Sequence, residues 1–96
     1  MKELRFNEEK DYLLKKKRGI SFKDIIKAIN EGEKVMVISH PNKKQYPNQK
    51  IYFVFMKNYI YAVPSVEEET YVFLKTIYPS HKYTEKYLNK KLKVKK

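Results

Sequence analysis

Two apolar runs joined by a pair of polar residues restrict the fold of this chain more than any other feature. The runs are Ile51–Met56 and Tyr59–Val63, and only Lys57 and Asn58 lie between them. Short runs rich in aromatic and β-branched residues favour strands, and a two-residue connection predicts an antiparallel hairpin. Asn58 tolerates the positive φ that such a turn requires. Because proline donates no backbone hydrogen bond, we expect Pro64 at a strand end or on a sheet edge.

Two helices with marked ends are predicted before this hairpin. Asn7 is a suitable N-cap for the first, and the basic residues 15–18 followed by Gly19 mark its C-terminal end. Ser21 and Asp24 form a capping-box pattern for the second, which Gly32 ends. Apolar residues at helical spacing give the second helix one buried face, made of Phe22, Ile25, Ile26 and Ile29.

The remaining chain predicts further strands and a last helix. Short strands are expected at Leu4–Phe6 and Val35–Ile38, and an acidic turn at residues 67–69 precedes a strand over Tyr71–Ile77. We expect Pro79 to end that strand and a short basic helix to follow directly from Ser80. The predicted fold class is therefore α+β, with two N-terminal helices, an antiparallel sheet of three or four strands and a C-terminal helix.

The charge of the chain restricts its partners. It has 96 residues, with 22 Lys and Arg against 11 Asp and Glu. This length suggests one domain, over residues 1–90, followed by a basic tail over residues 91–96. Such an excess of positive charge favours a polyanionic partner, which is nucleic acid, an anionic membrane surface or an acidic protein.

Other chemistries have little support in the sequence. Cysteine is absent and only His40 and His81 supply imidazoles, so we expect no disulfide, no metal site and no cofactor. The N-terminus lacks the apolar core of a signal peptide, and the longest apolar run, Ile51–Met56, is too short to span a bilayer. We therefore expect a cytoplasmic protein with no membrane partner.

Two stretches carry a resemblance to a known family. In FNEEKDYLLKKKRGISFKDI, an aromatic residue, a lysine, a basic pair, glycine, an apolar residue, serine and phenylalanine stand at Phe6, Lys10, Lys17, Arg18, Gly19, Ile20, Ser21 and Phe22. In KTIYPSHKYTEKY, an apolar strand precedes His81, Lys82 and Thr84 and a basic helix. Both stretches resemble BrnT-type toxins of type II toxin–antitoxin systems, in which an arginine stands at the His81 position.

The resemblance implies both a fold and an activity. It implies a RelE-like fold and an endoribonuclease that cleaves mRNA without a metal and so inhibits translation and growth. It also implies a cognate antitoxin protein, with operator DNA contacted only through that antitoxin.

Metal-free RNA cleavage requires a base, an acid and a cation near the phosphate. His81, with an ordinary pKa of about 6.5 and a place at a predicted helix start, is the first candidate for proton transfer. The other catalytic candidates are Lys82, Lys75 and Lys50 for phosphate charge and Glu67 as a base. The RNA-binding candidates are Lys10, Lys17, Arg18, Tyr83, Lys86 and Tyr87, whose tyrosines could stack on unpaired bases.

Other interpretations of the same residues remain open. Tyr83 and Tyr87 at helical spacing also fit a packed helix face, and the lysines of the first helix fit a solvated helix end. His40, in the long loop His40–Gln49, fits a side chain that closes the loop by hydrogen bonding. The chain could therefore be a non-catalytic nucleic-acid-binding module, or a subunit that only receives an acidic antitoxin segment.

Overall fold

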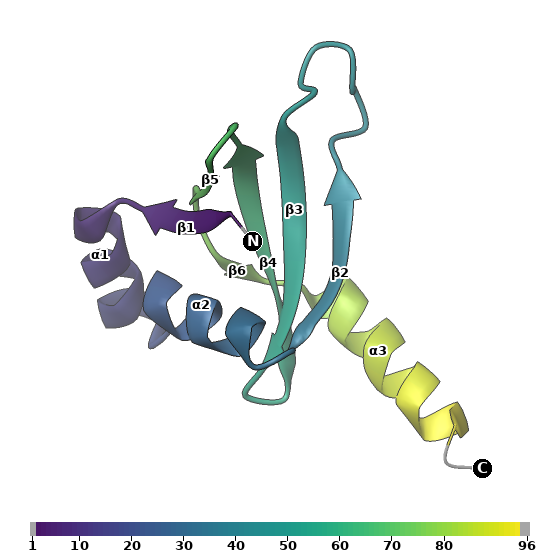
Figure 1. Ribbon diagram of the computed structural model, residues 1–96. Helices are drawn as coiled ribbons and strands as arrows, with labels where there is room; N and C mark the ends of the chain where they lie inside the picture. Colours follow the sequence, from purple (N-terminus) through teal and green to yellow (C-terminus); the bar gives the residue numbers. More distant parts are fainter. Residues whose placement is uncertain (1, 95–96) are drawn as a thin grey trace.

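The computed structural model describes residues 2–94 and has the predicted α+β fold, with helices on both faces of one mixed sheet (Figure 1). The elements in chain order are β1 (Glu3–Phe6), α1 (Glu8–Arg18), α2 (Phe22–Asn30), β2 (Lys34–Ser39), β3 (Gln49–Met56), β4 (Tyr59–Glu67), β5 (Tyr71–Leu74), β6 (Tyr78–Pro79) and α3 (His81–Val94). Helix α3 includes residues 91–94 of the predicted basic tail, while residues 95–96 lie outside the described residues. No helix within the described residues combines the length and the apolar character needed to cross a membrane.

The ends of α1 and α2 form as their capping residues predict. Asn7 Oδ1 accepts a hydrogen bond from Lys10 N at 2.9 Å, and Gly19 ends α1 with a φ of 72°. Ser21 and Asp24 form the reciprocal capping box of α2, with Asp24 N donating to Ser21 Oγ at 3.1 Å and Ser21 N donating to Asp24 Oδ2 at 3.0 Å. These local bonds satisfy helix-end groups that the helices themselves leave unpaired.

The sheet is larger than predicted and is not purely antiparallel. Among the described residues it has six strands, in the order β1-β5-β4-β3-β2, with β6 paired to β4. Strand β1 lies parallel to β5, with Leu4 opposite Val72. The prediction of a three- or four-stranded antiparallel sheet was wrong. The β1–β5 pairing joins residues far apart in the chain, so no turn in the sequence predicts it. The predicted hairpin is confirmed, with φ values of 54° at Lys57 and 62° at Asn58.

Pro64 lies inside a central strand, so its predicted place at a strand end or edge was wrong. It is opposite Ile51 in the β3–β4 ladder. Antiparallel pairing alternates between the two sides of a strand, and the Pro64 carbonyl, which accepts from Lys75 N at 2.8 Å, points away from β3. On that side β6 pairs with residues 61–62 and β5 pairs with residues 65–67. The missing N–H of Pro64 falls in the gap between these two short strands.

The strand predicted over Tyr71–Ile77 is interrupted after Leu74, whereas the predicted step from a strand ended by Pro79 into the last helix is confirmed. β5 stops at Leu74, and the chain continues along the same side of β4, where Tyr78 and Pro79 pair with it as β6 before α3 begins. Ile77 lies in the interruption between β5 and β6, only 1% exposed, within the main core. Burial of this side chain next to α1 and β4 replaces further strand pairing.

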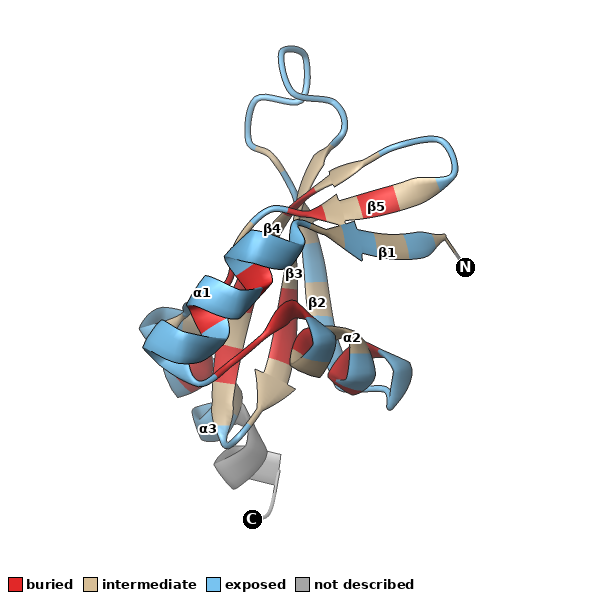
Figure 2. Cartoon of the chain, turned by 90° about the vertical axis from the view of Figure 1, so that its left-hand side faces the viewer, coloured by how far each residue is buried: buried red, intermediate tan, exposed pale blue. Residues whose placement is uncertain are grey.

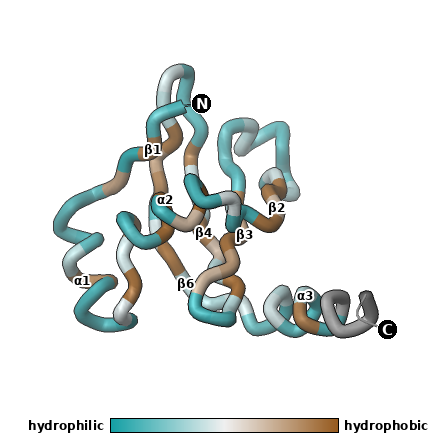
Figure 3. Tube along the Cα trace, turned by 60° about the horizontal axis from the view of Figure 1, so that its bottom comes forward, coloured by the Kyte–Doolittle hydropathy of each residue, from teal (hydrophilic) through white to brown (hydrophobic). Residues whose placement is uncertain are grey.

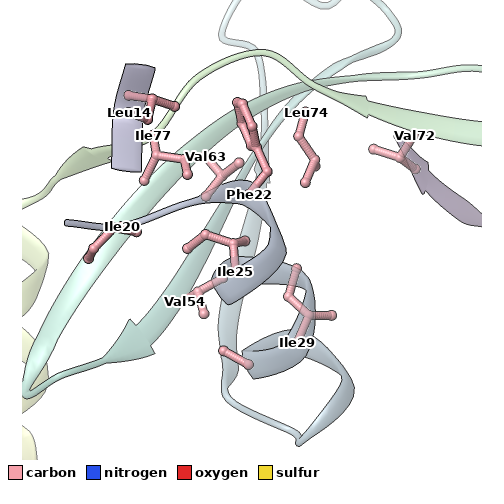
Figure 4. Packing of buried hydrophobic residues seen from close by; sticks show 11 residues of the cluster. Leu14, Ile20, Phe22, Ile25, Ile29, Val54, Val63, Val72, Leu74 and Ile77 are labelled. Carbon is pink, nitrogen blue, oxygen red and sulfur yellow. The ribbon is translucent and has the colours of Figure 1, made fainter. Parts of the chain in front are cut away.

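The main core lies between the sheet and α1 and α2 (Figures 2 and 4). Phe22 and Ile25 of α2 are fully buried against Val54, Val63 and Leu74 of the sheet. Each such side chain stabilises the fold by roughly 1.5–3 kcal/mol relative to exposure to water. A smaller cluster on the opposite face, with Phe53, Ile60 and Ala62 buried, packs against α3. The two faces differ because successive residues of β3 and β4 point to opposite sides.

Candidate nucleic-acid interface

Basic side chains of α1 and of the chain after β5 line one open groove of about 610 Å³. Four of the lining residues are cationic and exposed, namely Lys10, Lys17, Arg18 and Lys75, and one, Glu9, is acidic. Positions 10, 17 and 18 share one helix face because they are separated by about two turns. The parallel pairing of β1 with β5 brings α1 beside Phe73 and Lys75. The structure therefore brings together three of the predicted RNA-binding residues and one predicted catalytic lysine.

A smaller cavity of about 140 Å³ lies next to this groove and shares Lys75 with it. Its other lining residues include His40, Lys50 and Ser65. Three backbone contacts explain their convergence. Lys75 N donates to Pro64 O at 2.8 Å, Lys50 lies opposite Ser65, and His40 N donates to Gln49 O at 3.0 Å. One imidazole and two lysines thus face the same small space.

His40 has a fixed orientation within its loop. Its Nδ1 accepts a hydrogen bond from Asn42 N at 3.0 Å, and the Tyr46 ring lies 4.5 Å away, centroid to centroid. The loop-closing role expected for His40 is confirmed. Because Nδ1 accepts this bond, a neutral His40 carries its proton on Nε2, which can donate a hydrogen bond. His40 was not among the residues predicted as catalytic, and only its place before a proline in the long loop pointed to it.

Glu67 is held between two lysines rather than exposed as a base. Its carboxylate forms ion pairs with Lys50 and with Lys2, the latter at 3.0 Å. The hydrogen bond from Lys50, and then that from Lys2, lowers the pKa of Glu67 below its ordinary range. The same contact raises the pKa of Lys50. A carboxylate stabilised in this way binds a proton weakly, so its geometry favours a role in positioning Lys50.

His81 and Lys82 lie at the other end of the sheet. His81 Nδ1 is 2.8 Å from the hydroxyl of Tyr59, and α3 starts where Ser80 N donates to Ile60 O. Tyr59 and Glu67 are the first and last residues of β4, about 26 Å apart at 3.3 Å per residue. The structure therefore does not bring His81 and Lys82 together with Lys50 and Glu67.

The predicted RNA-binding residues of α3 are also separate from the groove. The Tyr83 ring packs on Phe53 with centroids 4.4 Å apart, and the Tyr87 ring packs on Phe55 at 4.9 Å. Both rings face the sheet side opposite the main core. The Lys86 ammonium lies 5.7 Å from the centroid of Tyr83. These contacts match the alternative interpretation of the two tyrosines as packing residues.

Neither metal ligation nor known relatives identify the site. Within the part of the chain that the structure describes, no three His, Cys, Asp or Glu side chains form a group that could hold a metal ion. Comparison of the chain with protein-family models, with curated protein sequences and with solved structures gives no match.

Proposed function

We propose that this chain is an endoribonuclease of the toxin type, which binds RNA in the Lys10–Lys75 groove and cleaves it at the cavity lined by His40 and Lys50. The observation that carries the proposal is the position of Lys75, which lines both spaces. A phosphate backbone in the groove would meet the four cations and continue to the imidazole. Such contacts release counterions and supply most of the affinity for nucleic acid.

The residues at the small cavity suit phosphodiester cleavage by the neighbouring 2′-hydroxyl. In this reaction the 2′-oxygen attacks phosphorus, the bond to the 5′-oxygen breaks, and the products are a 2′,3′-cyclic phosphate and a 5′-hydroxyl. Lys50 and Lys75 would stabilise the charge on the phosphoryl oxygens. A neutral His40 would donate a hydrogen bond from Nε2 to a phosphoryl oxygen, while water takes the proton of the 2′-hydroxyl and supplies one to the leaving 5′-oxygen. His81 remains a prediction for proton transfer at the separate Tyr59 end.

The proposal includes the biological setting implied by the resemblance. Cleavage of mRNA would inhibit translation and growth, and a cognate antitoxin protein would neutralise the chain. Operator DNA would be contacted only through that antitoxin. The excess of 22 basic over 11 acidic residues fits both an RNA substrate and an acidic protein partner.

A non-catalytic RNA-binding module is the second candidate, and one observation favours it. Among the described residues, the lining of the small cavity contains no carboxylate, and Glu67 beside it is neutralised by two lysines. A base for the 2′-hydroxyl is therefore not provided by an acidic side chain there. This candidate predicts RNA binding that depends on salt, without cleaved product.

Incubation of the purified chain with total RNA in EDTA distinguishes the two candidates. The toxin proposal predicts fragments from the wild type that His40→Ala and Lys75→Ala lose, whereas Lys27→Ala on α2 serves as the matched surface control. Loss of cleavage in His81→Ala but not in His40→Ala would place the chemistry at the Tyr59 end. Intact RNA that still shifts on a gel would support the binding module and contradict cleavage of free RNA.

A further inference from the structure

The other edge of the sheet carries features of a protein-docking surface. β2 is the edge strand opposite β1, and within residues 2–94 it pairs only with β3. Two of its valines are unusually exposed for their type, Val35 at 41% and Val37 at 38%. Figure 1 shows β2 along one side of the sheet, with α3 beside its lower end. An edge of this kind can accept a further strand.

The hydrogen-bond pattern identifies which backbone groups of β2 face outward. His40 N donates to Gln49 O, and the same ladder pairs Ile38 with Ile51 and Met36 with Phe53. Because antiparallel pairing uses alternate residues, the N–H and C=O groups of Val37 and Ser39 point away from β3. An incoming extended segment could pair with these groups without breaking any bond within the sheet.

An apolar groove of about 300 Å³ lies next to this edge, between β2 and α3. Its lining includes Val35, Met36, Phe53, Tyr83 and Tyr87, and among the described side chains its one charged lining residue is Lys86. Figure 3 shows hydrophobic segments on both β2 and α3, the two elements that supply most of this lining. Side chains of an added strand that point to this face would enter the groove, since alternate residues of a strand share a face.

The positive charge beside the β2 edge indicates which kind of segment binds there. Lys34 lies at the start of β2, on the face of Tyr52, and Lys86 lies at the groove. A second copy of the chain would bring its own net charge of +11 against these lysines. Like charges that approach across an interface disfavour association, whereas opposite charges increase its rate and specificity.

We propose that the β2 edge and the adjoining α3 groove bind an extended acidic segment of a protein partner as an added strand. Apolar side chains of the segment enter the groove, and the alternate acidic side chains lie near Lys34. Main-chain hydrogen bonds supply the affinity and the alternating side chains supply the specificity. This surface is separate from the Lys10–Lys75 groove, so the inference holds whether or not the chain cleaves RNA.

A selection of random displayed peptides on the immobilised chain tests this surface at physiological ionic strength. Enriched peptides should alternate apolar and acidic residues. A synthetic version of an enriched peptide should bind the Val37→Pro variant of the chain about tenfold more weakly than the wild type, because the proline removes an outward N–H of β2. The same peptide should bind the Val37→Thr variant as tightly as the wild type. Circular dichroism and thermal unfolding verify that the proline variant folds.

Three outcomes would overturn the inference. One is a selection that enriches no peptide, and another is an enriched peptide that lacks acidic residues or binds Val37→Pro as tightly as the wild type. The third is a wild-type dimer in sedimentation analysis that Val37→Pro converts to monomer, which would assign the edge to a second copy of the chain. Loss of RNA binding in Lys75→Ala with unchanged peptide binding would separate this surface from the proposed RNA site.

Discussion

Replacement of Asp11 by alanine should destabilise the fold strongly, although Asp11 is a charged residue on a helix. Its side chain is only 6% exposed, and its Oδ1 accepts a hydrogen bond from Phe22 N at 2.5 Å. Phe22 is the first residue of α2, so its N–H has no partner within that helix. The carboxylate therefore joins α1, which carries most of the basic groove, to the start of the most buried helix.

The magnitude follows from the charge and burial of this bond. Hydrogen bonds to charged groups contribute about 1.5–3 kcal/mol, and the alanine variant leaves a buried N–H without a partner. A domain of 96 residues loses roughly 4–8 °C in Tm for each kcal/mol. Asp11→Ala should therefore lower Tm by about 8–16 °C if the cost is about 2 kcal/mol.

Urea unfolding and thermal unfolding measure this effect, with Asp11→Asn as the matched control. The asparagine keeps an acceptor oxygen without the charge, so it should lose about half as much, because charged hydrogen bonds are about twice as strong as neutral ones. Surface substitutions ordinarily change the free energy of unfolding by no more than about 0.5 kcal/mol. A change this small for Asp11→Ala would contradict a stabilising bond between Asp11 and Phe22.

Three further substitutions test single contacts. Gly19→Ala should cost about 1 kcal/mol in unfolding free energy, because φ is 72° while a Cβ would meet nothing within 4 Å, and an unchanged urea midpoint would contradict this. Thr84→Val should cost about 1–3 kcal/mol and speed hydrogen exchange at Ile60, whose N–H donates to Thr84 Oγ1 at 2.8 Å. Glu67→Gln should cost about 0.5–1 kcal/mol at neutral pH. Lys50 and Lys2 lower the pKa of Glu67 in the folded chain. The stabilisation by its ion pairs is therefore fully present above the pKa of about 4.3 in the unfolded chain, and it is lost as the pH falls through the lower pKa of the folded chain. A difference between wild type and Glu67→Gln that persists in urea unfolding at low pH would contradict that assignment.

Local signals predicted the helices and the hairpin because the determining contacts lie close in sequence. Asn7 and Lys10, Ser21 and Asp24, and the Lys57–Asn58 turn each act within a few residues. The early end of β5 and the central place of Pro64 depend on where β6 returns to β4. Such pairing joins distant segments, so composition and periodicity alone do not reveal it.

Only the part of the candidate site that lies within one helix was predicted from the sequence. The helical spacing of Lys10, Lys17 and Arg18 placed them on one face, but their meeting with Lys75 requires the parallel β1–β5 pair. Adjacency in sequence grouped His81 with Lys75, whereas the chain between them runs along β4 and places His81 at the opposite end of that strand. The neighbouring position of His40 depends on the β2–β3 pairing.

The salt dependence of RNA binding by Lys75→Ala shows whether this lysine contacts RNA. Binding of a short single-stranded RNA is measured at several salt concentrations for the wild type, for Lys75→Ala and for Lys27→Ala. If Lys75 contacts phosphate, its loss makes the negative slope of log affinity against log salt shallower by about 0.7, and Lys27→Ala leaves the slope unchanged. Equal slopes for the wild type and Lys75→Ala would contradict an RNA site at this lysine.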